Sequence, residues 1–141
     1  MDIVKFIERA FTSIWGIGIV EMNRKSFGDR GERAAVQYLK NKEYQILAVN
    51  FRSGRYEIDI IAQDRETLVF IEVKATSNID YGYPEEKVDL TKQKHISKAA
   101  QAFIQQRGLE NLDCRFDVIA IVNTFGKIQI SHIEDAFWVN R

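Results

Sequence analysis

Five short segments of the chain are rich in β-branched, aromatic and other apolar residues and are bounded by polar residues, which is the pattern of buried strands. These segments are 44–49, 56–62, 67–74, 116–122 and 127–131. Asp64, Arg65 and Glu66 lie between the second and third segments and predict a hairpin turn. Residues 124–126 predict another turn, between the last two strands.

Two other segments repeat apolar residues every three or four positions, as amphipathic helices do. The first predicted helix runs from about Asp29 to Asn41, with Asp29 and Glu32 spaced as a capping box. The second covers 90–107 and is followed by Gly108, a residue that commonly ends a helix. The order helix, three strands, helix, two strands predicts an α/β fold in which helices flank a mixed β-sheet.

Residues 1–27 are interpreted as a separate amphipathic arm, and residues 28–141 as one domain. Ile3, Ile7 and Phe11 stand at helical spacing, which predicts a helix that docks on its own domain or on a second copy. A membrane-surface role for the arm is the alternative. No apolar run approaches the roughly 20 residues of a membrane span. No cleavage site follows such a run, so we expect neither a span nor export.

The charge balance is neutral, which limits the partners to expect. The 141 residues include 20 Lys and Arg and 20 Asp and Glu, so a nucleic acid would be held by a local patch rather than by net charge. Cys114 is the only cysteine, which excludes an internal disulfide and favours the cytoplasm. His95 and His132 have no His or Cys at ligand spacing, and Asp117 is expected to bond Arg115 or nearby backbone.

Charged residues occur in strands that otherwise read as core. Glu72 and Lys74 end an apolar strand and share one face, about 6.6 Å apart at strand spacing. A two-residue loop at 65–66 would place Asp59 of the preceding strand opposite Glu72, with Cβ atoms about 5 Å apart. Facing carboxylates repel, so either one is protonated or a divalent cation holds both. The simpler alternative is an ion pair of Glu72 with Lys74 at the end of the sheet.

The first predicted helix supplies a third carboxylate. Glu32 stands on the same stripe as Ala35, Val36 and Leu39, which is the apolar side that should face the sheet. Glu32 is therefore a candidate ligand for the same ion. The alternative is that it only completes the capping box with Asp29.

The spacing of Asp59, Glu72 and Lys74 resembles the Asp…Glu-X-Lys signature of the PD-(D/E)XK nuclease superfamily. A longer match, covering about residues 28–138, is similar to the bacterial YraN-like family, whose members resemble Holliday-junction resolvases. It comprises Gly31-Glu32, Asn50-Phe51-Arg52, 57–62, 70–74, Tyr81-Gly82, Lys92, 115–118 and Ala136-Phe137. The chain differs from the family pattern by having Glu43 and Tyr56 where glycines are usual and Thr76 where an arginine is common.

The resemblance implies a restriction-endonuclease-like fold and a metal-dependent DNA endonuclease that hydrolyses phosphodiester bonds, in branched or structured DNA by analogy with resolvases. Mg²⁺ or Mn²⁺ would be held by Asp59, Glu72 and the backbone carbonyl of Val73, with Glu32 at the same or a second ion. Lys74 would orient the attacking water and stabilise the developing charge. A homodimer is expected on the same analogy.

Basic residues near the predicted site form a candidate DNA-binding patch. They are Arg52, Arg55, Lys92, Lys94 and Lys98. Phosphate contacts of this kind supply most of the affinity for DNA, although a basic stripe on a helix is also typical of ordinary solvated surface. A protein that keeps the nuclease fold and binds nucleic acid without cutting it is the main alternative function, and a purely structural role for the ion pair is the third.

Overall fold

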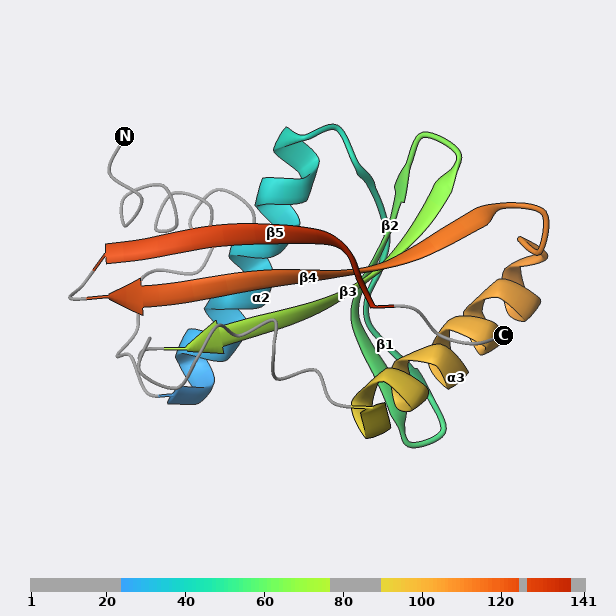
Figure 1. Cartoon of the computed structure of the whole chain (residues 1–141), viewed down its shortest axis with the longest axis horizontal. Helices are drawn as coiled ribbons and strands as arrows, with labels where there is room; N and C mark the ends of the chain where they lie inside the picture. Colours follow the sequence, from blue (N-terminus) through green and yellow to red (C-terminus); the bar gives the residue numbers. More distant parts are fainter. Residues whose placement is uncertain (1–23, 77–89, 125–126, 138–141) are drawn as a thin grey trace.

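The computed structural model describes residues 24–76, 90–124 and 127–137, which form a five-stranded sheet between two helices (Figure 1). The elements are α2 (Arg24–Asn41), β1 (Gln45–Ser53), β2 (Tyr56–Asp64), β3 (Thr67–Thr76), α3 (Leu90–Arg107), β4 (Asp113–Thr124) and β5 (Lys127–Phe137). This order confirms the predicted α/β class. Residues 1–23, which make up most of the predicted arm, lie outside the described residues. Neither described helix is both long and apolar enough to cross a membrane.

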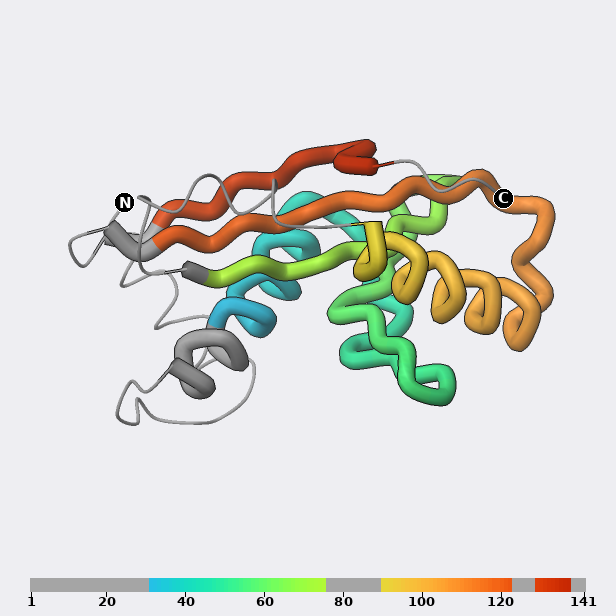
Figure 2. The backbone as a smooth tube through the Cα atoms, turned by 60° about the horizontal axis from the view of Figure 1, so that its bottom comes forward, coloured from blue at the N-terminus to red at the C-terminus, as the bar shows by residue number. Residues whose placement is uncertain are grey.

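The sheet is mixed, with strand order β1-β2-β3-β4-β5. β3 and β4 are parallel, and the other neighbouring strands are antiparallel. Two parallel neighbouring strands need a long crossover connection, and α3 lies in the connection between β3 and β4. Figure 2 shows β4 and β5 running side by side along the long axis of the molecule.

Each face of the sheet is covered by one helix and has its own core. The α2 side buries Leu39 with strand residues that include Val69 and Ile71. The α3 side buries Phe103 with Leu68 and Phe70. Successive residues of β3 thus enter opposite cores, as alternation along a strand requires, and both faces of this strand are apolar because both are covered.

The two helices end in the same way. The backbone N–H of Tyr44 donates to the carbonyl of Leu39 at 3.0 Å, and Glu43 at the turn has a positive φ of 68°. This is the Schellman motif, whose turning residue is usually glycine, so Glu43 occupies a position that glycine would adopt with less strain. Gly108 has a φ of 64° and ends α3 as predicted.

The start of α2 differs from the prediction. The helix is already formed at Arg24, so Asp29 is inside it and does not cap its beginning. The capping-box prediction for Asp29 and Glu32 is therefore wrong. An acidic pair three residues apart is equally compatible with a helix interior, where both residues lie on neighbouring turns.

β1 and β2 are distorted at Asn50 and Asp59. The β1–β2 register contains Val49↔Ile60 and Phe51↔Ile58 but not the intervening pair, and Asn50 has a positive φ of 52°. Ile58 packs in the α3 core, whereas Ile60 packs in the α2 core. Residues two apart share a face in a regular strand, so β2 rotates at Asp59.

The rotation carries the end of the β1–β2 hairpin onto α3. Phe51 meets Phe103 with ring centroids 5.2 Å apart, and Tyr56 meets His95 at 5.0 Å. The β2–β3 ladder runs only from Asp64↔Thr67 to Ile60↔Ile71, so the two strands separate beside Asp59.

Candidate active site

Asp59 and Glu72 meet where β2 separates from β3. The predicted two-residue turn is confirmed by the pair Asp64↔Thr67, and its register brings Asp59 beside Glu72. The backbone N–H of Val73 donates to Asp59 Oδ2 at 2.8 Å. Glu72 is only 5% exposed and shares a hydrogen bond with the Asp59 carboxyl group. Two acidic side chains therefore share one largely buried location.

The pKa of Asp59 is raised from 3.8 to about 8. Burial is the largest cause, because it penalises the charged form, and the neighbouring charge of Glu72 is the second. The hydrogen bond from Val73 acts in the opposite direction, and the charge of Glu32 adds to the rise. Burial and the neighbouring charge therefore favour the protonated form of Asp59, which can donate a hydrogen bond to Glu72.

Two ammonium groups lie against the same oxygen of Glu72. Lys74 Nζ lies 3.4 Å from Oε1, and Lys92 Nζ lies 3.5 Å from it. Lys74 follows Glu72 along β3, whereas Lys92 comes from the first turn of α3. Glu72 and Lys74 thus lie on the same face of β3, as predicted. Helix α3, which packs on that face, adds Lys92 as a second cation.

Glu32 approaches the pair from the other side of the sheet. A Cβ at the preceding Gly31 would lie 3.3 Å from Ala75 Cβ and from Ile121 Cδ1, so this glycine permits close contact of α2 with β3 and β4. Glu32 is close enough for its charge to raise the pKa of Asp59. Within 24–76, 90–124 and 127–137, however, no three His, Cys, Asp or Glu side chains converge as a metal-binding group. The structure therefore brings together two predicted carboxylate ligands with Glu32 as a neighbour.

The predicted DNA-binding residues divide into two groups. Lys92 points inward to Glu72. Lys94 and Lys98 are exposed on α3, and Arg52 and Arg55 are exposed at the hairpin end that packs beside this helix. All five basic residues therefore lie on α3 or on the β1–β2 hairpin, and four of them are exposed.

Contacts within the hairpin partly occupy its two arginines. The Arg52 guanidinium lies 3.5 Å from Glu57 with 74% of its side chain exposed. The Arg55 guanidinium lies over the Tyr56 ring, 5.4 Å from the centroid. An ion pair this exposed is weak, so it leaves Arg52 available to a phosphate.

A second buried polar cluster, centred on Asp117, is more extensive than the sequence indicates. Asp117 is fully buried. It accepts hydrogen bonds from Arg115 Nε at 3.1 Å, from His132 Nε2 at 2.7 Å and from the backbone N–H of Asp135 at 3.1 Å. The predicted bond to Arg115 is confirmed, but the bond to His132 was not predicted. Asp117 carries the same signal as Glu72, an acidic residue in an apolar strand, and that signal does not distinguish the two roles.

Arg115 extends the cluster to the hairpin of β2 and β3 and to the end of α2. Its Nη1 donates to Asp64 at 3.2 Å and its Nη2 to the Tyr44 hydroxyl at 2.6 Å. The pKa of Tyr44 is raised to about 12, mainly by burial, even though the Arg115 charge opposes the rise. Asp117 and Asp64 thus have cationic and hydrogen-bonding partners, which indicates a structural role.

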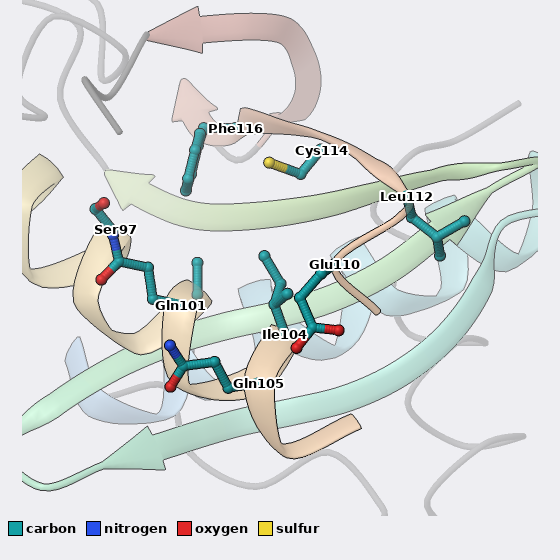
Figure 3. A pocket seen from close by; sticks show the side chains of 9 residues that line it. Ser97, Gln101, Ile104, Gln105, Glu110, Leu112, Cys114 and Phe116 are labelled. Atoms are coloured by element: carbon teal, nitrogen blue, oxygen red, sulfur yellow. The ribbon is translucent and has the colours of Figure 1, made fainter. Parts of the chain in front are cut away.

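A cavity of about 230 Å³ lies apart from both clusters, between α3 and the beginning of β4 (Figure 3). Its lining includes Gln101, Gln105, Cys114 and Phe116, and it contains none of the predicted site residues. Cys114 is half-buried near the beginning of β4.

Comparison with known proteins gives consistent relatives. Residues 31–121 match the family described as "Uncharacterised protein family UPF0102". A "UPF0102 protein" of Persephonella marina is 46% identical over 110 residues, which are 78% of this chain and 91% of the relative. The "UPF0102 protein" of Caldicellulosiruptor saccharolyticus is 40% identical over 118 residues, 82% of this chain and all of the relative. As its YraN-like pattern predicts, the chain belongs to the UPF0102 family.

Proposed function

We propose that this protein is a metal-dependent DNA endonuclease of the PD-(D/E)XK type, with its active site at Asp59, Glu72 and Lys74. The observation that carries the proposal is the burial of two acidic side chains against each other beside a lysine. Such a grouping is costly for folding, because a buried charge needs compensation. Perturbed acidic groups of this kind are concentrated at functional sites.

The residues fit Mg²⁺ or Mn²⁺. Mg²⁺ prefers oxygen ligands, keeps several waters and is commonly held by only one or two protein carboxylates together with substrate phosphates. Asp59 and Glu72 supply two carboxylates, and the Val73 carbonyl and Glu32 are the further candidates. The described residues bring no third carboxylate to the pair. This agrees better with an ion that keeps several water ligands than with an ion held entirely by protein side chains.

The lysine beside the pair suits phosphodiester hydrolysis. When bound, Mg²⁺ would neutralise negative charge that develops on the phosphate. Lys74 presents an ammonium group 3.4 Å from Glu72, where it would orient the water and stabilise the same charge. In the reaction the water oxygen bonds to phosphorus and the bond from phosphorus to the leaving sugar oxygen breaks. The protons of the water pass to the leaving oxygen and to solvent.

DNA would approach along the face that carries α3 and the hairpin end. Arg52 and Arg55 lie on the hairpin, and Lys94 and Lys98 lie on the helix, all with exposed side chains. These four cations would contact phosphates of a strand that passes over α3 and the hairpin toward the acidic pair. Branched or otherwise structured DNA is the proposed substrate, and a homodimer is the proposed assembly, both on the family analogy.

A protein that binds nucleic acid without cleaving it is the second candidate. The neutral net charge favours this alternative. The complete set of Asp59, Glu72 and Lys74 favours the enzyme, because binding alone has no need of all three.

Cleavage of labelled duplex, single-stranded, flap and four-way DNA with Mg²⁺ or Mn²⁺ tests the proposal. We expect cutting of at least one substrate by the wild type and loss of it in Glu72→Gln and Lys74→Gln. Asp64→Asn is the matched control, because it removes a carboxylate of β2, the strand of Asp59, that pairs with Arg115 outside the site. Binding without cleavage by the wild type would favour the second candidate, and activity that survives Glu72→Gln would refute the site.

A further inference from the structure

We propose that Lys92 is a positioning residue which holds Glu72 in the metal-free protein and competes with the metal ion for that carboxylate. This inference rests on the proposed function and gives Lys92 a role in the metal-free protein in addition to the DNA contact predicted from the sequence. The role is specific to one side chain of α3 and does not extend to the exposed lysines of the same helix.

The contact joins two elements that are distant in sequence. Glu72 lies in β3, with 5% of its side chain exposed, and Lys92 lies in the first turn of α3 with 39% exposed. Lys92 Nζ and Lys74 Nζ approach the same Oε1 at 3.5 and 3.4 Å. Both distances exceed the roughly 2.7–2.9 Å of a close charge-assisted hydrogen bond. The two lysines therefore neutralise Glu72 through its charge, and neither makes a tight bond to it.

A divalent ion at Glu72 would change this balance. The ion supplies the positive charge that the buried carboxylate needs, so the second ammonium becomes a like charge a few ångströms from the metal. Lys74 is fixed to the strand beside Glu72 and is 29% exposed, whereas Lys92 is more exposed and has a route to solvent. We expect Lys92 to be the cation that withdraws when the site is loaded.

Helix α3 also connects this contact to the predicted DNA-binding face. His95, one turn after Lys92, packs against Tyr56 near the hairpin end, with ring centroids 5.0 Å apart. A withdrawn Lys92 ammonium would remain at the first turn of α3, beside the acidic pair, where it would contact a phosphate of a bound strand. The same lysine thus opposes metal binding in the free protein and favours substrate binding in the loaded one.

These two effects give Lys92→Gln a distinctive result. Removing the competing charge should tighten Mn²⁺ binding about tenfold, because unit charges this close interact strongly even at the effective dielectric of a protein. Cleavage should nevertheless fall. If Lys92 had only a structural role, its replacement would weaken both Mn²⁺ binding and cleavage, or neither of them. Lys92→Arg keeps the charge and should restore the wild-type Mn²⁺ affinity to within about twofold.

Calorimetric titration of the full chain with Mn²⁺, in the absence of DNA, tests the inference. Lys40→Gln is the control for loss of one charge, because Lys40 is exposed near the end of α2 and away from the site. The Mn²⁺-induced rise in melting temperature provides a second measurement for each variant, and a larger rise is expected for Lys92→Gln than for wild type.

The outcomes separate the two proposals. Unchanged or weaker Mn²⁺ binding by Lys92→Gln, in a variant that melts cooperatively, overturns the role of Lys92 while leaving the metal site intact. Tighter binding by Lys40→Gln of the same size overturns it as well, because the effect would then be one of net charge. Absence of Mn²⁺ binding by the wild type refutes the proposed function, and the inference about Lys92 with it.

Discussion

Replacing Asp59 with asparagine should stabilise the metal-free protein. The Asp59 carboxyl group is largely buried beside Glu72, and its pKa is raised to about 8 in the folded state from 3.8. A folded-state pKa above the unfolded value means that folding takes up a proton between about pH 4 and pH 8. Stability therefore falls as pH rises through this window, and the full cost is reached above pH 8.

The size of the effect follows from that uptake. At pH 7 the unfolded side chain is ionised while the folded one is protonated, and the interval from 3.8 to 7 corresponds to about 4 kcal/mol. This is an upper bound, since relaxation of the site reduces it. Asparagine carries no charge and its carbonyl oxygen can still accept from Val73 N–H. We expect Asp59→Asn to gain about 1 kcal/mol or more, a rise of roughly 3 °C in melting temperature.

Thermal unfolding of chelator-treated protein at pH 5, 6.5 and 8 measures the change. The gain of Asp59→Asn should increase with pH across this range. Asp64→Asn is the control with the opposite sign, because Asp64 accepts a hydrogen bond from Arg115 at 3.2 Å and its replacement weakens an ion pair. A lower melting temperature for Asp59→Asn at pH 8, or a gain that does not vary with pH, would refute the reasoning.

Four further substitutions test other parts of the structure. Asp117→Ala leaves Arg115 and His132 without their buried carboxylate and should cost about 3–5 kcal/mol in urea unfolding; an unchanged midpoint would contradict the role of the cluster. Phe103→Ala, in the α3 core, should cost about 3–5 kcal/mol by the same assay. Glu43→Gly should stabilise by about 1 kcal/mol in thermal unfolding, because φ is positive there, and a loss would count against strain. Arg52→Gln should weaken DNA binding and lower the magnitude of its salt dependence by about one ion, with Mn²⁺ affinity unchanged.

The parts of the fold that depend on neighbouring residues were predictable from the sequence. The β2–β3 register follows from the two-residue turn at 65–66, so the meeting of Asp59 and Glu72 could be derived from one hairpin. The bounds of α3 were also correct, because both its periodicity and Gly108 are local signals.

The features that depend on packing between distant segments were not predictable in this way. β5 extends to Phe137, six residues beyond the predicted end at Ser131. The prediction stopped there because His132 and the acidic residues after it read as the polar end of a strand. In the structure Asp117 of the neighbouring strand bonds His132 and the backbone of Asp135, and periodicity along one strand carries no information about such a partner.

The same reason applies within the candidate site. The contact of Lys92 with Glu72 depends on how α3 crosses the sheet, and the rotation of β2 at Asp59 depends on the positive φ of Asn50 in the adjacent strand. Neither leaves a pattern in the segments that contain these residues. The sequence thus indicated the candidate side chains, and the tertiary structure determined which ones meet.

The rotation of β2 has a consequence for how the protein tolerates change. Ile58 and Ile60 anchor the backbone of Asp59 in two separate hydrophobic layers, one under each helix. A volume change in either core would therefore displace the Asp59 carboxyl group. Substitutions in the two cores are therefore coupled through Asp59. A substitution in the core under one helix can compensate for a volume change in the core under the other.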